Sequence, residues 1–161
     1  MKKGVILAFA AITLALGTVS CSKSDDSPSQ EQLLQNKWQE VKYVYYKQDS
    51  SIIGEEVEEY DDCSKKDFTE FKSDNTILEK SFYFNDKNVC TEDSSSSKGK
   101  WKFEGGKLVI YGYEPNEFNY NTIITINNNE LVIESLGGNY YDEKNDVDIP
   151  AYKTRVYLKK M

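Results

Sequence analysis

The side chains in this chain that could do chemistry are carboxylates and thiols, because none of its 161 residues is histidine. Without an imidazole base, neither a Ser-His-Asp triad nor a Cys-His pair can form. Adjacent acids occur at Glu58-Glu59 and at Asp61-Asp62. In loops of an acidic protein such pairs are usually solvated, whereas a glycosidase holds two carboxylates on either side of a sugar bond. We therefore expect no catalytic residues, no enzyme activity and no cofactor.

The thiols belong to three cysteines, Cys21, Cys63 and Cys90. Two thiols without histidine do not complete a tetrahedral zinc site. The acids and asparagines of residues 142–148 lack the glycine and the terminal glutamate of a calcium-binding loop. The sequence therefore predicts no metal site.

Cys21 follows a basic start and an apolar run over residues 5–17. Such a start, ended by small residues, is typical of a secretory signal peptide. The run is shorter than the roughly 20 residues that span a bilayer, so we expect residues 1–20 to be removed. The position of Cys21 after Thr18-Val19-Ser20 resembles a bacterial lipobox, in which the cysteine is lipidated, although Thr18 stands where leucine is usual. An ordinary secreted protein cut near Ser20 is the alternative.

The acidic run that follows, residues 22–26, resembles the lipoprotein export signal of the Bacteroidetes. That resemblance implies an outer-membrane lipoprotein held at the cell surface through Cys21, and the periplasm-facing leaflet is the alternative. Residues 22–30 carry no apolar side chain, so residues 21–30 are expected to be a flexible tether. Residues 31–161 then form one domain, a length that can bury a real core.

Charge excludes one class of partner. The whole chain has a formal charge of −7, and residues 1–20 contain two lysines and no acid, so the mature chain would carry −9. Such a chain repels nucleic acid and anionic head groups. We expect no nucleic-acid partner and a membrane contact that depends on the lipid.

The two remaining cysteines, Cys63 and Cys90, would lie in an oxidising compartment. An isolated pair there is most simply a disulfide. Two reduced, buried thiols are the alternative.

The sequence predicts that these residues are held by β-strands and the turns between them. Short runs of Tyr, Phe, Val, Ile and Thr are separated by Gly, Asn, Asp and Ser, after a helical turn near residues 30–36. The predicted strands span residues 38–46, 67–71, 76–84, 98–103, 107–113, 120–126, 130–135 and 152–158. Turn residues at 73–75, 104–106 and 127–129 indicate sequential hairpins. We therefore predict an all-β fold, an eight-stranded antiparallel up-and-down barrel, with a two-sheet sandwich as the alternative. The long segments 47–62 and 137–150 are predicted to be loops.

Several stretches together resemble the lipocalin-like domain of Bacteroidetes lipoproteins over residues 31–161. They are LLQNKWQEV, DDCSKKDFTEF, NVC, KGKWKFEGGKLVI and TIITINNNELVIES. The resemblance implies a small calyx-like barrel in which Cys63 and Cys90 occupy the places of the family's cysteine pair. It also implies that Arg155, on the last strand, stacks over Trp38 and closes the base of the barrel, an arrangement for which arginine is better suited than lysine.

Aromatic side chains are the main resource for binding. The chain has 12 tyrosines and 7 phenylalanines, and tyrosine combines apolar area with a hydroxyl, as ligand pockets require. The candidates for lining the barrel are Tyr43, Tyr45, Phe82, Trp101, Tyr111 and Tyr120. We expect a small hydrophobic or glycan-like ligand inside the barrel. The alternative is a protein-interaction or structural module of a surface complex, with a filled barrel.

Overall fold

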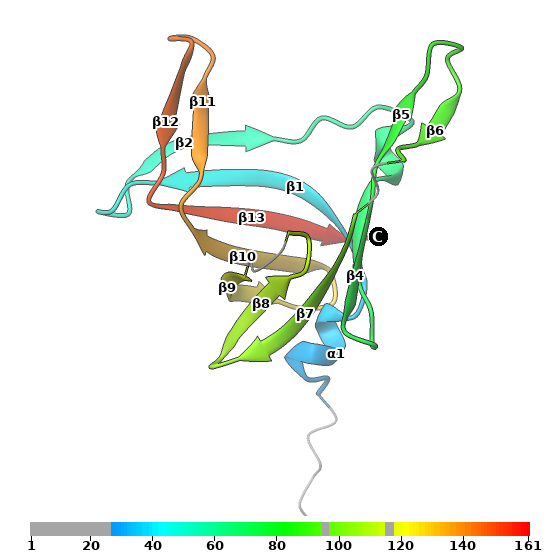
Figure 1. Cartoon of the computed structure of the whole chain (residues 1–161). Coiled ribbons are helices and arrows are strands. Elements are labelled where there is room, and N and C mark those ends of the chain that lie inside the picture. Colours follow the sequence, from blue (N-terminus) through cyan, green and yellow to red (C-terminus); the bar gives the residue numbers. More distant parts are fainter. Residues whose placement is uncertain (1–26, 95–96, 115–117) are drawn as a thin grey trace, which may run out of the picture.

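A computed structural model of the chain describes residues 27–94, 97–114 and 118–161 (Figure 1). Cys21, the predicted signal peptide and most of the predicted tether lie outside the described residues. None of the helices in the described ranges is long and apolar enough to cross a membrane.

Eight strands of the described chain form a closed antiparallel barrel (Figure 1). They are β1 (Lys37–Tyr46), β3 (Phe68–Phe71), β4 (Thr76–Lys80), β7 (Lys98–Glu104), β8 (Lys107–Tyr111), β9 (Phe118–Ile126), β10 (Glu130–Leu136) and β13 (Lys153–Lys160). Each pairs with the next, and β13 pairs back with β1, which closes the sheet. The predicted fold class is confirmed, and every predicted strand overlaps one of these eight.

Both long segments predicted to be loops contain strands. The first holds β2 (Ile52–Val57), which extends the sheet along β1, and the second holds the hairpin of β11 (Asn139–Asp142) and β12 (Val147–Pro150). The predicted strand 76–84 divides at Ser81, after which β5 (Phe82–Phe84) leaves the barrel and pairs with β6 (Cys90–Glu92). The β5–β6 and β11–β12 hairpins rise on opposite sides of the end of the barrel that lies away from α1 (Figure 1).

The base of the barrel is filled with apolar side chains. The buried core consists of Leu34, Trp38, Phe71, Ile77, Trp101, Leu108, Leu131 and Leu158. The two indoles are fixed by hydrogen bonds, since Nε1 of Trp38 donates to the carbonyl of Leu34 at 2.9 Å and Nε1 of Trp101 donates to the carbonyl of Lys72 at 3.1 Å. A packed base leaves the opposite end of the barrel as the place where space can remain.

A short helix, α1 (Gln30–Leu34), covers this base. Ser29 and Gln32 form a reciprocal capping box, which satisfies backbone N–H groups at the start of the helix. The helix ends with Leu34 fully buried in the core. The described chain therefore enters the domain at its closed end.

A bulge in β1 determines which side chains face the interior. Glu40 lies opposite Leu158 and Tyr43 lies opposite Val156, with a register shift between Glu40 and Lys42. Residues opposite each other in an antiparallel pair share a face, and Leu158 and Val156 pack in the core. The extra residue of the bulge thus brings both Glu40 and Tyr43 inward, which strict alternation would not do.

The predicted contact between Arg155 and Trp38 is wrong. Trp38 lies opposite Lys160 on β13, whereas Arg155 lies opposite Val44, which is five residues or about 17 Å along the strand. Arg155 also faces outward, since its neighbours Thr154 and Val156 face the interior. Its Nε donates to Glu134 at 2.7 Å and its guanidinium lies 5.0 Å from the Tyr46 ring.

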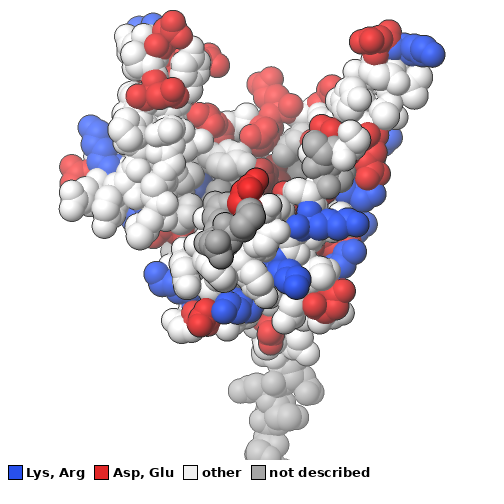
Figure 2. All heavy atoms as spheres, in the orientation of Figure 1, with Lys and Arg blue, Asp and Glu red and all other residues white. Residues whose placement is uncertain are grey.

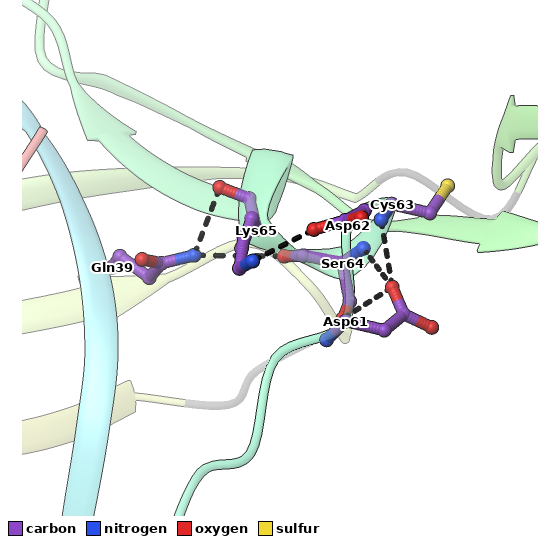
Figure 3. A network of polar contacts seen from close by, with 6 residues as sticks. All are labelled: Gln39, Asp61, Asp62, Cys63, Ser64 and Lys65. Carbon is purple, nitrogen blue, oxygen red and sulfur yellow. Dashed lines mark hydrogen bonds and ion pairs between the residues drawn. The ribbon is translucent and has the colours of Figure 1, made fainter.

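The structure joins Cys63 and Cys90 by a disulfide, which ties β6 to the turn η1 (Ser64–Lys66). Figure 3 shows how this turn is held against β1. The side-chain amide of Gln39 donates to the carbonyl of Lys65 at 3.2 Å, and Asp61 accepts the backbone N–H groups of Cys63 and Ser64, each at 2.7 Å. The disulfide therefore anchors the β5–β6 hairpin to a turn that is itself fixed to the barrel.

Candidate functional site

The open half of the barrel contains two cavities that share Glu79 as a wall. The upper cavity, about 450 Å³, is bordered by Tyr43, Tyr45, Tyr113 and other side chains. The side cavity, about 250 Å³, lies where β1 and β3 separate, since these two strands pair at two positions, the second being Trp38 opposite Thr69. The barrel is therefore packed with side chains at its base and hollow at its open end. This hollow end, made of the two cavities, forms a cup.

Carboxylates line the side cavity. Its acidic residues are Glu40, Glu58, Asp67 and Glu79. Lys80 is the cation among the described residues that border it, and its Nζ is paired with Glu92 at 2.7 Å. Figure 2 shows acidic side chains gathered in the hollow between the two raised hairpins. The site is therefore strongly negative.

Tyrosine hydroxyls are paired with the inward carboxylates. The Tyr43 hydroxyl makes a short hydrogen bond to Glu40. The Tyr113 hydroxyl donates to Oε1 of Glu79 at 2.8 Å, and the Ser97 hydroxyl donates to Oε2 of the same carboxylate at 2.5 Å. The half-buried carboxylates of Glu40 and Glu79 are thus each oriented by at least one hydroxyl donor, as a pre-arranged binding group would be.

Two further tyrosines complete this wall. The Tyr45 hydroxyl donates to Glu56 at 2.8 Å, and the Tyr60 hydroxyl donates to the backbone carbonyl of Glu40 at 2.6 Å. Tyr140, from the β11–β12 hairpin, packs on Tyr45 with 5.6 Å between ring centroids. The hairpin therefore reaches the rim of the cup through aromatic contact.

Glycine makes room for one of the rings. Gly99 lies two residues before the inward Trp101 on β7, so it shares the interior face. A Cβ atom at Gly99 would lie 2.5 Å from the ring of Tyr113. The absence of a side chain at this position allows Tyr113, which lies beyond the end of β8, to fold back over the sheet and reach Glu79.

The surroundings change the acidity of these groups. Burial raises the pKa of Glu40, and repulsion from Glu79 and Glu58 adds to this, while the hydrogen bond from Tyr43 opposes it. Burial, and to a smaller extent the hydrogen bond to Glu56 and the charge of that residue, raise the pKa of Tyr45 to about 12. Burial and Glu79 likewise raise the pKa of Tyr113. The tyrosines therefore remain protonated donors at neutral pH.

Replacing Glu40 with glutamine should raise the free energy of unfolding near neutral pH by about 1 kcal/mol. The change removes a charge whose burial is costly, while the amide oxygen still accepts the Tyr43 hydroxyl. Because the pKa of Glu40 is higher in the folded chain than in the unfolded one, the folded state binds the proton more tightly. The penalty therefore fades as pH falls through that raised pKa.

Thermal unfolding at about pH 7 and about pH 4 measures this effect, with the exposed Glu130→Gln as control. The gain should be present at the higher pH and shrink at the lower one. A Glu40→Gln variant that is less stable than the wild type at neutral pH would contradict the electrostatic account.

The structure brings two of the six predicted lining residues to the cavities, Tyr43 and Tyr45. Trp101 lies in the solid core between Phe71 and Phe103, so it supports the cup without lining it. Phe82 lies on β5, outside the barrel sheet.

Tyr111 and Tyr120 face outward, so their prediction as lining residues is wrong. Tyr111 lies opposite Lys100 and stacks on Phe118 at 5.7 Å, while Tyr120 lies opposite Val109. The Nζ of Lys102 lies 5.9 Å from the Tyr111 ring on this outer face. Alternation from the buried Trp101 could have indicated this, because Lys100 and Lys102 both fall on the opposite face.

Sequence reasoning missed Glu40, Glu79, Tyr60 and Tyr113. A usable signal exists for the two acids, because each lies two residues after an inward apolar side chain, Trp38 or Ile77. An acid at an interior-facing position of a strand is unusual and marks a binding site or a paired charge. Tyr113 gives no comparable signal, since its contact depends on how the chain turns after β8.

A closed eight-stranded barrel is wide enough to hold packed side chains or one small ligand, as in lipocalins. Residues 34–133 match the model of the lipocalin-like domain. The chain belongs to this family.

Comparison with solved structures finds the bovine odorant binding protein, as a deswapped triple mutant, with 16% sequence identity and a TM-score of 0.35. The match covers 80% of this chain and 75% of that one. None of the curated proteins matches the chain.

Proposed function

We propose that this chain is a lipid-anchored lipocalin-like lipoprotein that binds a small ligand in its cup. The observation that carries the proposal is the division of the barrel into a packed base and a hollow, hydroxyl-lined open half. A ligand suited to this lining has an apolar body and polar groups, since aromatic rings and hydrogen-bonding side chains both line the space. The chain acts in binding and not in catalysis.

The place where the described chain enters the barrel supports an orientation for this binding. The described chain enters at the closed end, beside α1. A lipid on Cys21 would therefore hold the base near the membrane and leave the cup facing away from it. We propose the outer membrane as the site of anchoring, with the domain at the cell surface.

Anchoring is tested by replacing Cys21 with serine in the cells that naturally make the protein. The variant should move from the detergent-extracted membrane fraction to the soluble fraction, while Ser22→Ala should stay in the membrane. A Cys21→Ser chain that remains in the membrane would contradict the lipid anchor.

Ligand binding is tested by native mass spectrometry of protein purified from those cells. We expect an additional mass on the wild type, and its loss in Ile110→Trp, which places a larger side chain on the wall of the upper cavity. Ile124→Trp is the matched control, because Ile124 is 44% exposed on the same sheet. A bare mass in repeated gentle preparations of the wild type would contradict the proposal.

One observation favours a second function, a protein-interaction module. The β5–β6 hairpin projects from the barrel and exposes Tyr83, Phe84 and Val89 by 51%, 42% and 56%. If this hairpin docks a partner protein, Phe84→Ser should remove that partner from a cross-linked membrane complex and leave any bound small molecule in place.

A further inference from the structure

We propose that the ligand of this cup is an organic amine, whose ammonium group binds among the carboxylates of the side cavity and whose body extends into the upper cavity. This inference rests on the proposed function, because it assumes that the cup binds a small ligand. It adds the chemical class of that ligand.

The side cavity has more acidic than basic side chains around it. Glu40, Glu58, Asp67 and Glu79 border it, against Lys80 alone among the described lining residues. The Nζ of Lys80 is directed to Glu92 at 2.7 Å. A cationic group would be attracted to this space, and a carboxylate such as that of a fatty acid would be repelled.

The carboxylate of Glu40 can accept further hydrogen bonds. A carboxylate accepts about four hydrogen bonds. Glu40 receives one from a side chain, through the oxygen that faces Tyr43, and its other oxygen receives none within the described chain. An ammonium group carries three donors, so it matches a site in which oriented acceptors outnumber donors.

The carboxylates of the side cavity repel one of their number, Glu40. Glu40, Glu58 and Glu79 border the same cavity, and repulsion from Glu79 and from Glu58 adds to the rise in the pKa of Glu40. Burying like charges together is costly, and a cation placed between them would relieve that cost. The same contact in water would be worth much less.

Aromatic side chains border both cavities. Trp38 and Tyr60 border the side cavity, and Tyr43, Tyr45 and Tyr113 border the upper one. Aromatic faces attract cations through the ring quadrupole and also pack an apolar body. Glu79 borders both spaces, so one molecule of moderate length can contact the acids and the tyrosines together.

The test uses three probes of one shape, tyramine, tyrosol and 3-(4-hydroxyphenyl)propionate, which end in an ammonium, a hydroxyl and a carboxylate. Binding to the full chain in a neutral detergent is measured by isothermal titration calorimetry. Tyramine should bind at least about ten-fold more tightly than tyrosol, and the propionate should bind most weakly. Glu40→Gln and Glu79→Gln should each weaken tyramine about ten-fold, whereas Glu130→Gln should not change it.

The outcomes separate this inference from the proposed function. Tyrosol or the propionate binding as tightly as tyramine would overturn the amine assignment and leave a ligand-binding cup in place. Calcium binding that Glu40→Gln abolishes, without any tyramine binding, would also overturn it. If none of the three probes binds while protein from its own cells still carries an additional mass, the ligand is not an amine of this kind. If protein from its own cells carries no additional mass, the proposed function itself is contradicted.

Discussion

Replacing both Cys63 and Cys90 with serine should lower the free energy of unfolding by about 3.5 kcal/mol. The two cysteines are 27 residues apart in sequence, and removing the bond releases the entropy of that loop in the unfolded chain. The double replacement avoids leaving one free thiol. Urea unfolding of the variant and of the oxidised wild type measures the difference.

Reduction of the wild type provides the control, because it should lower stability by a similar amount without changing the sequence. The loss should also be local, since the bond ties β6 to the turn η1 and so holds the β5–β6 hairpin. We expect limited proteolysis to cut the double variant first between residues 81 and 92. An unchanged urea midpoint in the variant would contradict a stabilising role for the disulfide.

Replacing Trp38 with alanine should cost about 3–5 kcal/mol of unfolding free energy, the usual range for a buried large aromatic. Trp38 is fully buried, and its indole also holds the end of α1 through the carbonyl of Leu34 at 2.9 Å. The cavity left behind would join the side cavity, which Trp38 borders. Chemical denaturation followed by near-ultraviolet circular dichroism measures the loss.

Trp38→Phe separates the two contributions of the indole. It retains most of the volume and removes the hydrogen bond, so it should cost about 1–3 kcal/mol, less than the alanine variant. Equal losses in Trp38→Ala and Trp38→Phe would mean that the hydrogen bond to α1, and not the filling of the base, stabilises the barrel.

The barrel strands could be predicted because the signals for them are local. Glycine and asparagine turns and apolar alternation in β7, β8, β9 and β10 act within a few residues of each strand. β2 and the β11–β12 hairpin contain and are flanked by acids, which have low strand propensity, although each strand pairs with its neighbour in the chain across a short turn. For this reason the sequence alone predicts loops in these two segments.

The site was harder to predict because it depends on register. A one-residue bulge after Glu40 decides which side chains of β1 face inward, and no pattern in the sequence marks it. The contact between Arg155 and Trp38 was implied by the family resemblance, and it fails because Arg155 lies opposite Val44, five residues along β13 from the residue opposite Trp38. Tyr43 and Tyr45 were predicted to line the barrel, yet the acids that give the cup its chemistry were not.

A crystal structure of the protein purified from its own cells would show whether a ligand occupies the open half of the barrel. We expect ligand density that contacts Glu79 and extends from the side cavity between Glu40 and Tyr60 toward Tyr45 and Tyr113. Density confined to the outer face beside Phe118, or tyrosine rings collapsed into both cavities with no ligand between them, would contradict it.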